Sequence, residues 1–484
     1  MGLLRHFLPL VLVATSTTVL AGAAATATSD RPRLIVLTDY FKDPDDKQSM
    51  IRFLVYSNEF EVEGLIATSL AFNDGSVRPE LLREQIAEYA QVYPVLRQHG
   101  RPGYEYPEPS SLDRLVKRGA AVVRQPATGR NGFKVPYPEG ALDSRECGPA
   151  ENWVGAGKDT EASAHIISVV DRDDPRPVWI IAWGGSMDLA QAIWKVKHTR
   201  TPAGAARFIA RIRLYQISWQ DTGSVWLWNN VPDLFFIQTA GLNTGIYMEG
   251  PVELRDVAWV AKNVIHGHGP LGAGYPAIGA GGGKRERQVK EGDTPSFLHL
   301  LAPGLSDPAQ PEFGGWGGRF RRFEPGRNFF VPAEDHHPQS TERSRRSRWT
   351  LARWNEAIAH EFAARMDWCV QPFERANHAP VVHLAGDSSR RVLTHTVAAG
   401  TTLKLDAAGT TDPDRHALKY RWWNYAEAGT LAQPLVLEHS DGPVVRLVAP
   451  RVSAPATAHL ILEVTDTGEP RLTSYRRVVL TITP

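Results

Sequence analysis

The chain has 484 residues, of which 42% are hydrophobic and 22% charged, and its formal net charge is +1. Such a balance provides no general positive field for phosphates, which argues against nucleic acid as a partner. The two cysteines, Cys147 and Cys369, are too few for a disulfide scaffold, an iron–sulfur protein or a cysteine-rich zinc module. At about 150 residues per domain, the length predicts two or three domains.

The first 27 residues have the pattern of a secretion signal. Arg5 and His6 precede an apolar run from Phe7 to Val13, and small residues follow as far as Ala27. No later stretch is apolar over the roughly 20 residues that a membrane span requires. We therefore expect a secreted or periplasmic protein without a membrane span. Export would also permit a disulfide between the two cysteines.

Strand-like and helix-like patterns then alternate along the chain. The apolar run Leu34 to Leu37 predicts a strand that is covered on both faces. Further strands are predicted at 62–69 and 178–183, and helices at 45–60, 79–93, 186–196 and 351–366. This alternation indicates an α/β domain over residues 28–375, with a mostly parallel sheet and helices on both faces.

After Pro380 the pattern changes to short alternating segments separated by Gly, Pro and Asp. Strands are predicted at 402–405, 418–422, 444–448, 459–464 and 475–482. They indicate a small all-β sandwich of immunoglobulin-like type over residues 376–484. Trp422 is the expected core tryptophan of this sandwich.

An acidic cluster follows the first predicted strand. Asp39, Asp43, Asp45 and Asp46 lie within eight residues, where an open α/β sheet binds its ligands. Four like charges repel one another, so a buried arrangement needs a cation. Ca²⁺ fits because the ligands are oxygens and no His or Cys is nearby, and a carboxylate outside the metal shell could act as general base. The alternative is a set of acidic residues that stabilise a helix N-terminus.

Several longer motifs carry a family resemblance. They are Leu37-Thr-Asp39, Asp43-Pro-Asp-Asp46, Tyr56 to Phe60, Glu63 to Ser69, Trp183-Gly-Gly185, Glu291 to Phe297 and Gly314 to Gly318. The chain resembles the nucleoside hydrolases. It resembles more closely the exported cellulose-binding protein family, which combines a nucleoside hydrolase-like domain with a C-terminal β-sandwich.

The resemblance implies a role for individual residues. Asp45 takes the position of the general base, and Asn73 that of an Asn that helps to hold the sugar. Asn229 and Asn230 are candidates for the sugar-hydroxyl contacts. The implied Ca²⁺ ligands are Asp39, Asp46, the backbone carbonyl of Met187 and Asp293. Independently of the resemblance, Trp316 is expected to face a sugar, because it is flanked by glycines and Trp offers a flat apolar face.

The chain also departs from the nucleoside hydrolase pattern. Asp39 precedes Asp46 by seven positions, a wider spacing than in that family, and Gly292 stands where a His often assists the leaving base. The expected function is an exported calcium-dependent hydrolase of N-glycosyl or related glycosidic bonds. The alternative is a non-catalytic protein that binds cellulose or another polysaccharide. The partner is a sugar-containing small molecule or polysaccharide, and the resemblance is compatible with a homo-oligomer.

Overall fold

A computed structural model describes residues 30–40, 44–69, 75–122, 149–279, 285–286, 288–301 and 303–484. The predicted signal at 1–27, Asp43, Asn73 and Cys147 lie outside these residues. Arg31–Pro484 form one compact unit. Among the described residues, no helix is long and apolar enough to cross a membrane.

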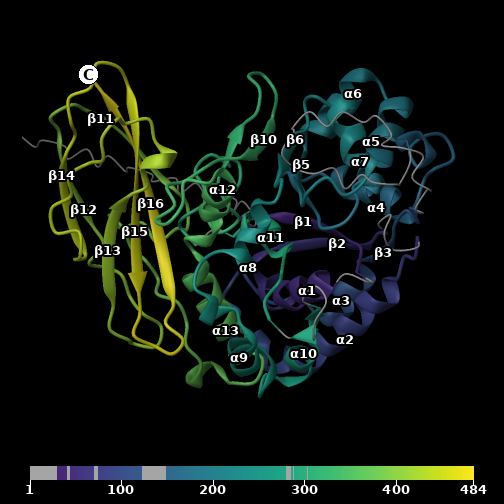
Figure 1. Cartoon of the computed structure of the whole chain (residues 1–484), viewed down its shortest axis with the longest axis horizontal. Coiled ribbons are helices and arrows are strands. Elements are labelled where there is room, and N and C mark those ends of the chain that lie inside the picture. Colours follow the sequence, from purple (N-terminus) through teal and green to yellow (C-terminus); the bar gives the residue numbers. More distant parts are fainter. Residues whose placement is uncertain are drawn as a thin grey trace, which may run out of the picture. The chain divides into compact units, whose positions relative to one another are not determined.

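The first part of the chain alternates strands and helices (Figure 1). Its strands are β1 (Arg33–Thr38), β2 (Glu61–Ala67), β3 (Val116–Arg118), β4 (Val178–Ala182), β5 (Ile212–Gln216), β6 (Phe235–Gln238), β7 (Ile278–Gly279), β8 (Arg285–Glu286), β9 (Phe320–Arg322) and β10 (Phe329–Pro332). Its helices are α1 (Pro44–Tyr56), α2 (Pro79–Leu96), α3 (Pro109–Arg114), α4 (Glu161–Val170), α5 (Met187–Thr199), α6 (Pro202–Ala210), α7 (Thr222–Asn230), α8 (Gly245–Met248), α9 (Val257–Val260), α10 (Gly269–Ala273), α11 (Thr294–Leu298), α12 (Arg343–Ala352) and α13 (Asn355–Asp367).

The central sheet has eight strands in the order β3-β2-β1-β4-β5-β6-β10-β9. All neighbours are parallel except β9, which runs antiparallel to β10 at one edge. The chain proceeds outward from β1 to β3 on one side, then crosses to β4 on the other. The carboxyl end of β1 is therefore a switch point, where ligands bind in open α/β sheets.

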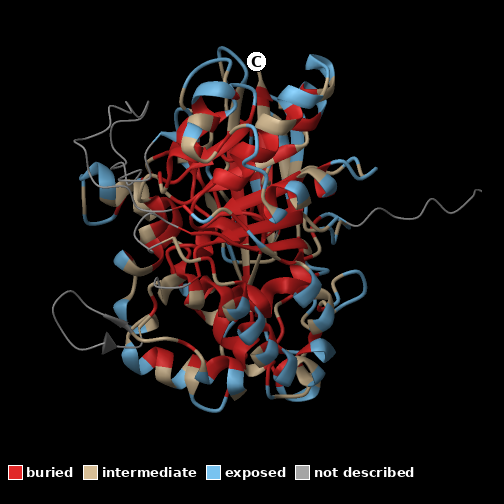
Figure 2. Ribbon diagram, turned by 90° about the vertical axis from the view of Figure 1, so that its right-hand side faces the viewer, coloured by how far each residue is buried: buried red, intermediate tan, exposed pale blue. Residues whose placement is uncertain are grey.

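Helices cover both faces of this sheet. In β1, Leu34 and Val36 pack with α1, α2, α11 and α13, whereas Ile35 and Leu37 pack with α4, α5, α6 and α7. Successive side chains of a strand point to opposite faces, so a strand buried on both sides is apolar throughout. Figure 2 shows this buried layer through the middle of the molecule. The predicted α/β fold with a mostly parallel sheet is confirmed.

The C-terminal part is all β. Its strands are β11 (Leu393–Ala398), β12 (Thr402–Asp406), β13 (Lys419–Asn424), β14 (Val444–Val448), β15 (Ala456–Thr465) and β16 (Thr473–Thr483). They form a four-stranded sheet, β11-β16-β15-β13, and a two-stranded sheet, β12-β14. Trp422 is buried in the core that both sheets share, which confirms its predicted place.

The helix predicted at 351–366 is instead interrupted. α12 ends at Ala352 and α13 begins at Asn355. The two residues between them contact the β-sandwich: the guanidinium of Arg353 lies 4.5 Å from the Tyr425 ring centre, and Trp354 packs edge-on against Tyr475. The apolar spacing alone did not show this break, because its cause is contact with residues that are distant in sequence.

Candidate functional site

The carboxyl end of β1 and the start of α1 bring three carboxylates together. Asp45 and Asp46 lie in the first turn of α1, and Asp293 directly precedes α11. One carboxylate oxygen from each of these residues lies within 4.8 Å of those of the other two. Asp46 and Asp293 are buried, Asp45 is half-buried, and Asp46 accepts a hydrogen bond from the Thr38 hydroxyl.

Two glycines leave room beside the acidic residues. A Cβ at Gly292 would lie 3.0 Å from Asp45 Oδ2, and one at Gly184 would lie 2.7 Å from Asp39 Oδ1. Asp39 is buried at the same edge of the sheet, next to the Gly-Gly turn, but it is outside the group of three. The absence of a Cβ at position 292 therefore lets the chain pass close to Asp45.

The composition of this group fits a hard divalent cation. All three side chains are carboxylates, the ligand type that Ca²⁺ prefers. Like charges at this separation raise the energy of the folded chain unless a cation lies between them. The site would hold Ca²⁺ through Asp46 and Asp293, with Asp39 beside them. The alternative role, in which Asp43 and Asp45 stabilise the helix N-terminus, stays open: Asp45 is in the first turn of α1, and Asp43 lies outside the described residues.

Polar side chains at the ends of β5 and β6 support the site, and the sequence analysis missed them. Asn243 donates to the carbonyl oxygen of Gly292 (3.1 Å) and accepts from the Thr239 hydroxyl. Gln216 donates to the carbonyl oxygen of Gly184 (3.0 Å). Gln216 and Thr239 both end apolar strand runs, and a polar residue at that point is the signal that could have identified them.

Met187 begins α5, directly after the Gly-Gly turn. Its side chain is buried in the core, and its backbone N–H donates to Asp221 (3.2 Å), which caps α7. The next residue, Asp188, accepts from Thr160 and from the N–H of Ala120. Burial raises the pKa of Asp188 to about 6, although these hydrogen bonds act in the opposite direction. The α5 N-terminus is thus fixed by two buried carboxyl groups.

The prediction that Trp316 faces a ligand is wrong. Its side chain is 1% exposed and packs edge-on against Tyr475 of β16. The glycines around it serve close packing, because a Cβ at Gly317 would lie 2.4 Å from His299 and one at Gly315 would lie 2.0 Å from Ser306. The Gly-Gly-Trp-Gly-Gly motif belongs to the contact between the two domains.

The two asparagines proposed for the sugar hydroxyls are not near the carboxylates. Asn229 and Asn230 end α7 and are exposed, and the backbone oxygen of Asn230 accepts from Lys197, in the last turn of α5. Helices in a parallel α/β fold run opposite to the strands, so these residues lie at the amino edge of the sheet. The prediction failed because it considered residue type without position. Asn73 is outside the described residues.

Comparisons with known proteins agree with this architecture. Residues 33–320 match the family described as "Cellulose-binding Sde182, nucleoside hydrolase-like domain". Residues 402–482 match "Cellulose-binding protein Sde0182, C-terminal domain". The chain belongs to the cellulose-binding Sde182 family. The family resemblance stated from the sequence is thereby confirmed.

A solved structure extends the Sde182 match over nearly the whole chain. It is a nucleoside hydrolase-related hypothetical protein from Saccharophagus degradans, described as associated with carbohydrate metabolism. The identity is 33%, the match covers 94% of this chain and 100% of that chain, and the TM-score is 0.75. The fold of this Sde182-family chain is therefore nucleoside hydrolase-like.

Two further solved structures are too distant to carry an argument. The effector protein XOO4466 is 10% identical over 71% of this chain and 95% of its own, with a TM-score of 0.35. The PKD domain of KIAA 1837 protein is 17% identical over 19% of this chain and 81% of its own, with a TM-score of 0.15. No curated protein matches the chain.

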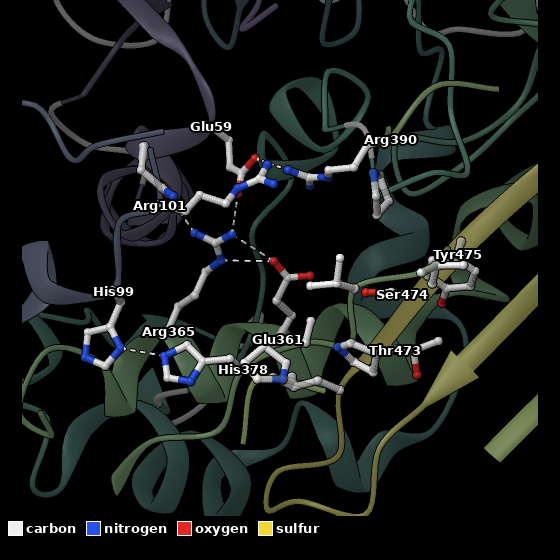
Figure 3. A pocket seen from close by; sticks show the side chains of 18 of the residues that line it. Glu59, His99, Arg101, Glu361, Arg365, His378, Arg390, Thr473, Ser474 and Tyr475 are labelled. Atoms are coloured by element: carbon white, nitrogen blue, oxygen red, sulfur yellow. Dashed lines mark hydrogen bonds and ion pairs between the residues drawn. The ribbon is translucent and has the colours of Figure 1, made fainter. Parts of the chain in front are cut away.

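The Sde182-family chain has a second candidate site, a cavity of about 300 Å³ lined by both domains (Figure 3). Glu59 lies at one side of it and pairs with Arg365 (3.0 Å) and Arg390 (2.8 Å). Burial by itself would raise the pKa of Glu59, but Arg390 and Arg365 lower it to about 2. On another side, His99 stacks on Trp368 and forms a ring-nitrogen contact of 2.9 Å with His378. The Glu59 carboxylate therefore has its charge satisfied by two guanidinium groups of the protein.

Proposed function

We propose that the chain is an exported hydrolase of N-glycosyl or related glycosidic bonds that depends on Ca²⁺. The observation that carries this proposal is the approach of Asp45, Asp46 and Asp293 to within 4.8 Å at the switch point of the sheet. Membership of a family with a nucleoside hydrolase-like domain supports it. The secretion-signal pattern at the N-terminus supports export.

In this mechanism each residue has a separate task. Asp46 and Asp293 would hold the cation, and Asp39, beside Gly184, completes the acidic edge. When bound, Ca²⁺ would orient a water and the sugar hydroxyls. Asp45, which is half-buried, takes a proton from the water as it attacks the anomeric carbon. Asn243 fixes the Gly292 backbone against Asp45 and so positions the base.

In the nucleoside hydrolases, a His often assists the departure of the leaving base. In this chain residue 292, which takes that position, is glycine and cannot protonate the leaving group. This favours substrates whose leaving group departs without protonation by that residue. Examples are an aryloxide and a weakly basic N-linked group. Asn73 is a further proposed sugar contact.

The proposal is tested with the purified full chain, dialysed against EDTA and supplied again with CaCl₂. A panel of nucleosides and aryl-ribosides is expected to show calcium-dependent cleavage. Asp45→Asn is expected to lower kcat by about 10²–10⁴-fold, the usual contribution of a general base. The control is Glu80→Gln, which also removes a carboxylate from the first turn of a helix, α2, but from an exposed side chain. Undiminished activity of Asp45→Asn, or no cleavage with calcium present, would refute the proposal.

A second candidate function is binding of cellulose or a related polysaccharide without turnover. It is supported by the descriptions of both matched family domains. In the described residues, however, no Trp, Tyr or Phe is among the exposed large apolar side chains. An aromatic surface that stacks on a sugar would therefore have to come from partly exposed side chains such as Trp194 or Trp423.

Retention on insoluble cellulose tests this second function. The full chain would be incubated with microcrystalline cellulose, with and without soluble oligosaccharide as competitor. Retention that the competitor removes, in a chain that cleaves nothing in the panel, would favour binding over hydrolysis. Absence of retention would exclude it.

A further inference from the structure

A second group of potential metal ligands lies in the β-sandwich, apart from the sheet-edge carboxylates. Asp412 and His416 belong to the loop between β12 and β13, and Asp466 directly follows β15. One ligand atom from each of these residues lies within 4.8 Å of those of the other two. No step of the proposed hydrolysis uses them.

The Asp412 carboxylate has one oxygen that its surroundings leave unsatisfied. Its side chain is 2% exposed. Oδ1 accepts from the backbone N–H groups of Asp414 and His416, both at 2.9 Å, whereas Oδ2 has no hydrogen-bond partner within the described part of the chain. A buried carboxylate oxygen without a partner is costly, and in native proteins it usually indicates a ligand or an ion.

Asp466 places a second buried negative charge beside the first. It is fully buried, and its Oδ1 accepts from the N–H groups of Gly468 and Leu472, both at 3.0 Å. A carboxylate oxygen of Asp466 lies within 4.8 Å of one of Asp412, so the two negative charges repel each other. Within the described residues, Asp466 forms no ion pair with an Arg or Lys.

Asn377 supplies another buried oxygen. Its Nδ2 donates to Asp466 Oδ2 (2.9 Å) and to the carbonyl oxygen of Pro470 (2.7 Å). Its Oδ1 is buried and has no partner in the described part of the chain. This oxygen belongs to the same amide group whose Nδ2 contacts the Asp466 carboxylate. An amide oxygen beside two carboxylates is a common ligand set for Ca²⁺.

We propose that Asp412, Asp466 and Asn377 hold a calcium ion in the β-sandwich, with His416 at its more exposed side. Oxygen donors outnumber the single imidazole nitrogen, which favours a hard cation over a transition metal. The proposal is independent of the proposed hydrolysis, because no residue is shared with the sheet-edge group.

The position of this site suggests what the ion does. Asn377 lies in the segment that joins the two domains, and its carbonyl oxygen accepts from Trp368 Nε1 (2.9 Å) in the α/β part. The next residue, His378, donates its backbone N–H to Asp414 (2.6 Å) and contacts His99 at one side of the cavity of Figure 3. A cation here fastens the linker to the sandwich and so stabilises the junction of the two domains.

The experiment uses the full chain, stripped with EDTA, and follows both calorimetric Ca²⁺ binding and the thermal midpoint. Asp293→Asn disables the sheet-edge group in the same chain, so the remaining binding event reports the sandwich. We expect that event to persist in Asp293→Asn, with Kd of roughly 10⁻⁴–10⁻³ M as in extracellular modules. Adding Asp412→Asn is expected to weaken it at least tenfold and to abolish the calcium-dependent rise in Tm.

Asp406→Asn is the matched control. Asp406 makes the same turn contact, accepting from the N–H two residues ahead (3.0 Å), but it pairs with Lys404. It should therefore leave calcium binding unchanged. Equal binding in Asp412→Asn and Asp406→Asn would overturn the proposal, as would a site that responds to Zn²⁺ but not to Ca²⁺.

A second variant keeps the test decisive if Asp412→Asn fails to fold. Asn377→Asp keeps an oxygen at the site and adds a charge. It is expected to tighten Ca²⁺ binding several-fold and to lower Tm in EDTA, because ligand charge tunes calcium affinity. Unchanged affinity in a folded Asn377→Asp chain would contradict the assignment. If only Ca²⁺ binding at the sheet-edge carboxylates is missing, the result contradicts the proposed hydrolysis and leaves the sandwich site supported.

Discussion

Two regions of the molecule use buried carboxylates in opposite ways. At the junction of the domains each carboxylate is enclosed by arginines: Asp335 contacts Arg319 (2.8 Å) and Arg353 (2.9 Å), and Glu59 contacts Arg365 and Arg390. At the carboxyl edge of the sheet, three carboxylates lie within 4.8 Å of one another. The first arrangement pairs opposite charges, whereas the second gathers like charges.

The difference separates a structural role from a binding role. A buried carboxylate between two guanidinium groups has its charge and hydrogen bonds satisfied by the protein, so it fixes the relative position of the domains. Gathered carboxylates destabilise the chain that holds them, and such a cost is typical of sites kept for a ligand.

The largest effect is expected at the junction. Arg319→Met leaves the fully buried Asp335 with one arginine fewer, and breaking a buried pair costs about 3–5 kcal/mol of unfolding free energy. Urea unfolding followed by fluorescence measures it. Arg321→Met, at an exposed position of β9, is the control and should change little. If Asp335→Asn in the same chain restores none of the loss, the uncompensated charge is not the cause.

The second largest effect is expected from acid, which should lower the stability of the junction between the domains. Burial lowers the pKa of His99 to about 4, below the 6.5 of an unfolded histidine. A lowered histidine pKa gives stability that is present above pH 6.5 and lost as the pH falls through 4, here roughly 3 kcal/mol. Glu59, with a pKa of about 2 against 4.5, extends the loss below pH 4.5. The unfolding free energy of His99→Gln should therefore fall less between pH 6.5 and 4 than that of the wild type and of exposed His395→Gln.

At the carboxyl edge of the sheet, loss of a charged side chain should raise the unfolding free energy instead of lowering it. Asp293→Asn removes one of three neighbouring charges, so the chelated protein should become more stable by about 1–2 kcal/mol. With excess Ca²⁺ the same variant should be less stable than the wild type, because binding energy adds to folded-state stability. Thermal unfolding in EDTA and in CaCl₂ gives both values. If Asp293→Asn lowers the thermal stability in EDTA, repulsion among the three carboxylates does not destabilise the wild type.

The smallest effect is expected at the opposite edge of the sheet. Asn229→Ala and Asn230→Ala change exposed side chains at the end of α7, so unfolding free energy should shift by less than about 0.5 kcal/mol. Cleavage of any substrate that the wild type accepts should be unchanged. A loss of kcat/KM in either variant would mean that the catalytic region extends beyond the carboxyl edge.

Local pattern was enough for much of the fold. The continuous apolar run at Leu34 to Leu37 predicted a strand covered on both faces, and the alternation after Pro380 predicted the strands of the sandwich. The spacing of apolar residues along the sequence reflects which side chains are buried, so these elements could be predicted from it. The acidic motif Asp43 to Asp46 predicted a ligand site at the carboxyl end of β1, and the structure brings three carboxylates together there. The strands β3 and β5 to β11 were not predicted, and the polar residues that support the site lie at the end of β5 and after β6.

Residues whose role depends on distant partners could not be placed in this way. Trp316 was expected at a sugar and is packed against Tyr475, which follows it by more than 150 positions. Glycines on both sides of a tryptophan are equally compatible with ligand access and with close packing. Asn243 was not considered at all, because its contact with Gly292 depends on the approach of two separate loops.

By itself, the sequence determined the two fold classes, the family and the acidic segment after β1, since each depends on local spacing or on long motifs. Only the tertiary structure decided which carboxylates meet. It joined Asp293 to Asp45 and Asp46 across some 250 residues of chain, and Asn377 to Asp466 across the linker. The balanced net charge concealed both outcomes, because a sum over the chain contains no information on which charges become neighbours. Electrostatic energy depends on separation in space, and that separation is a property of the folded chain.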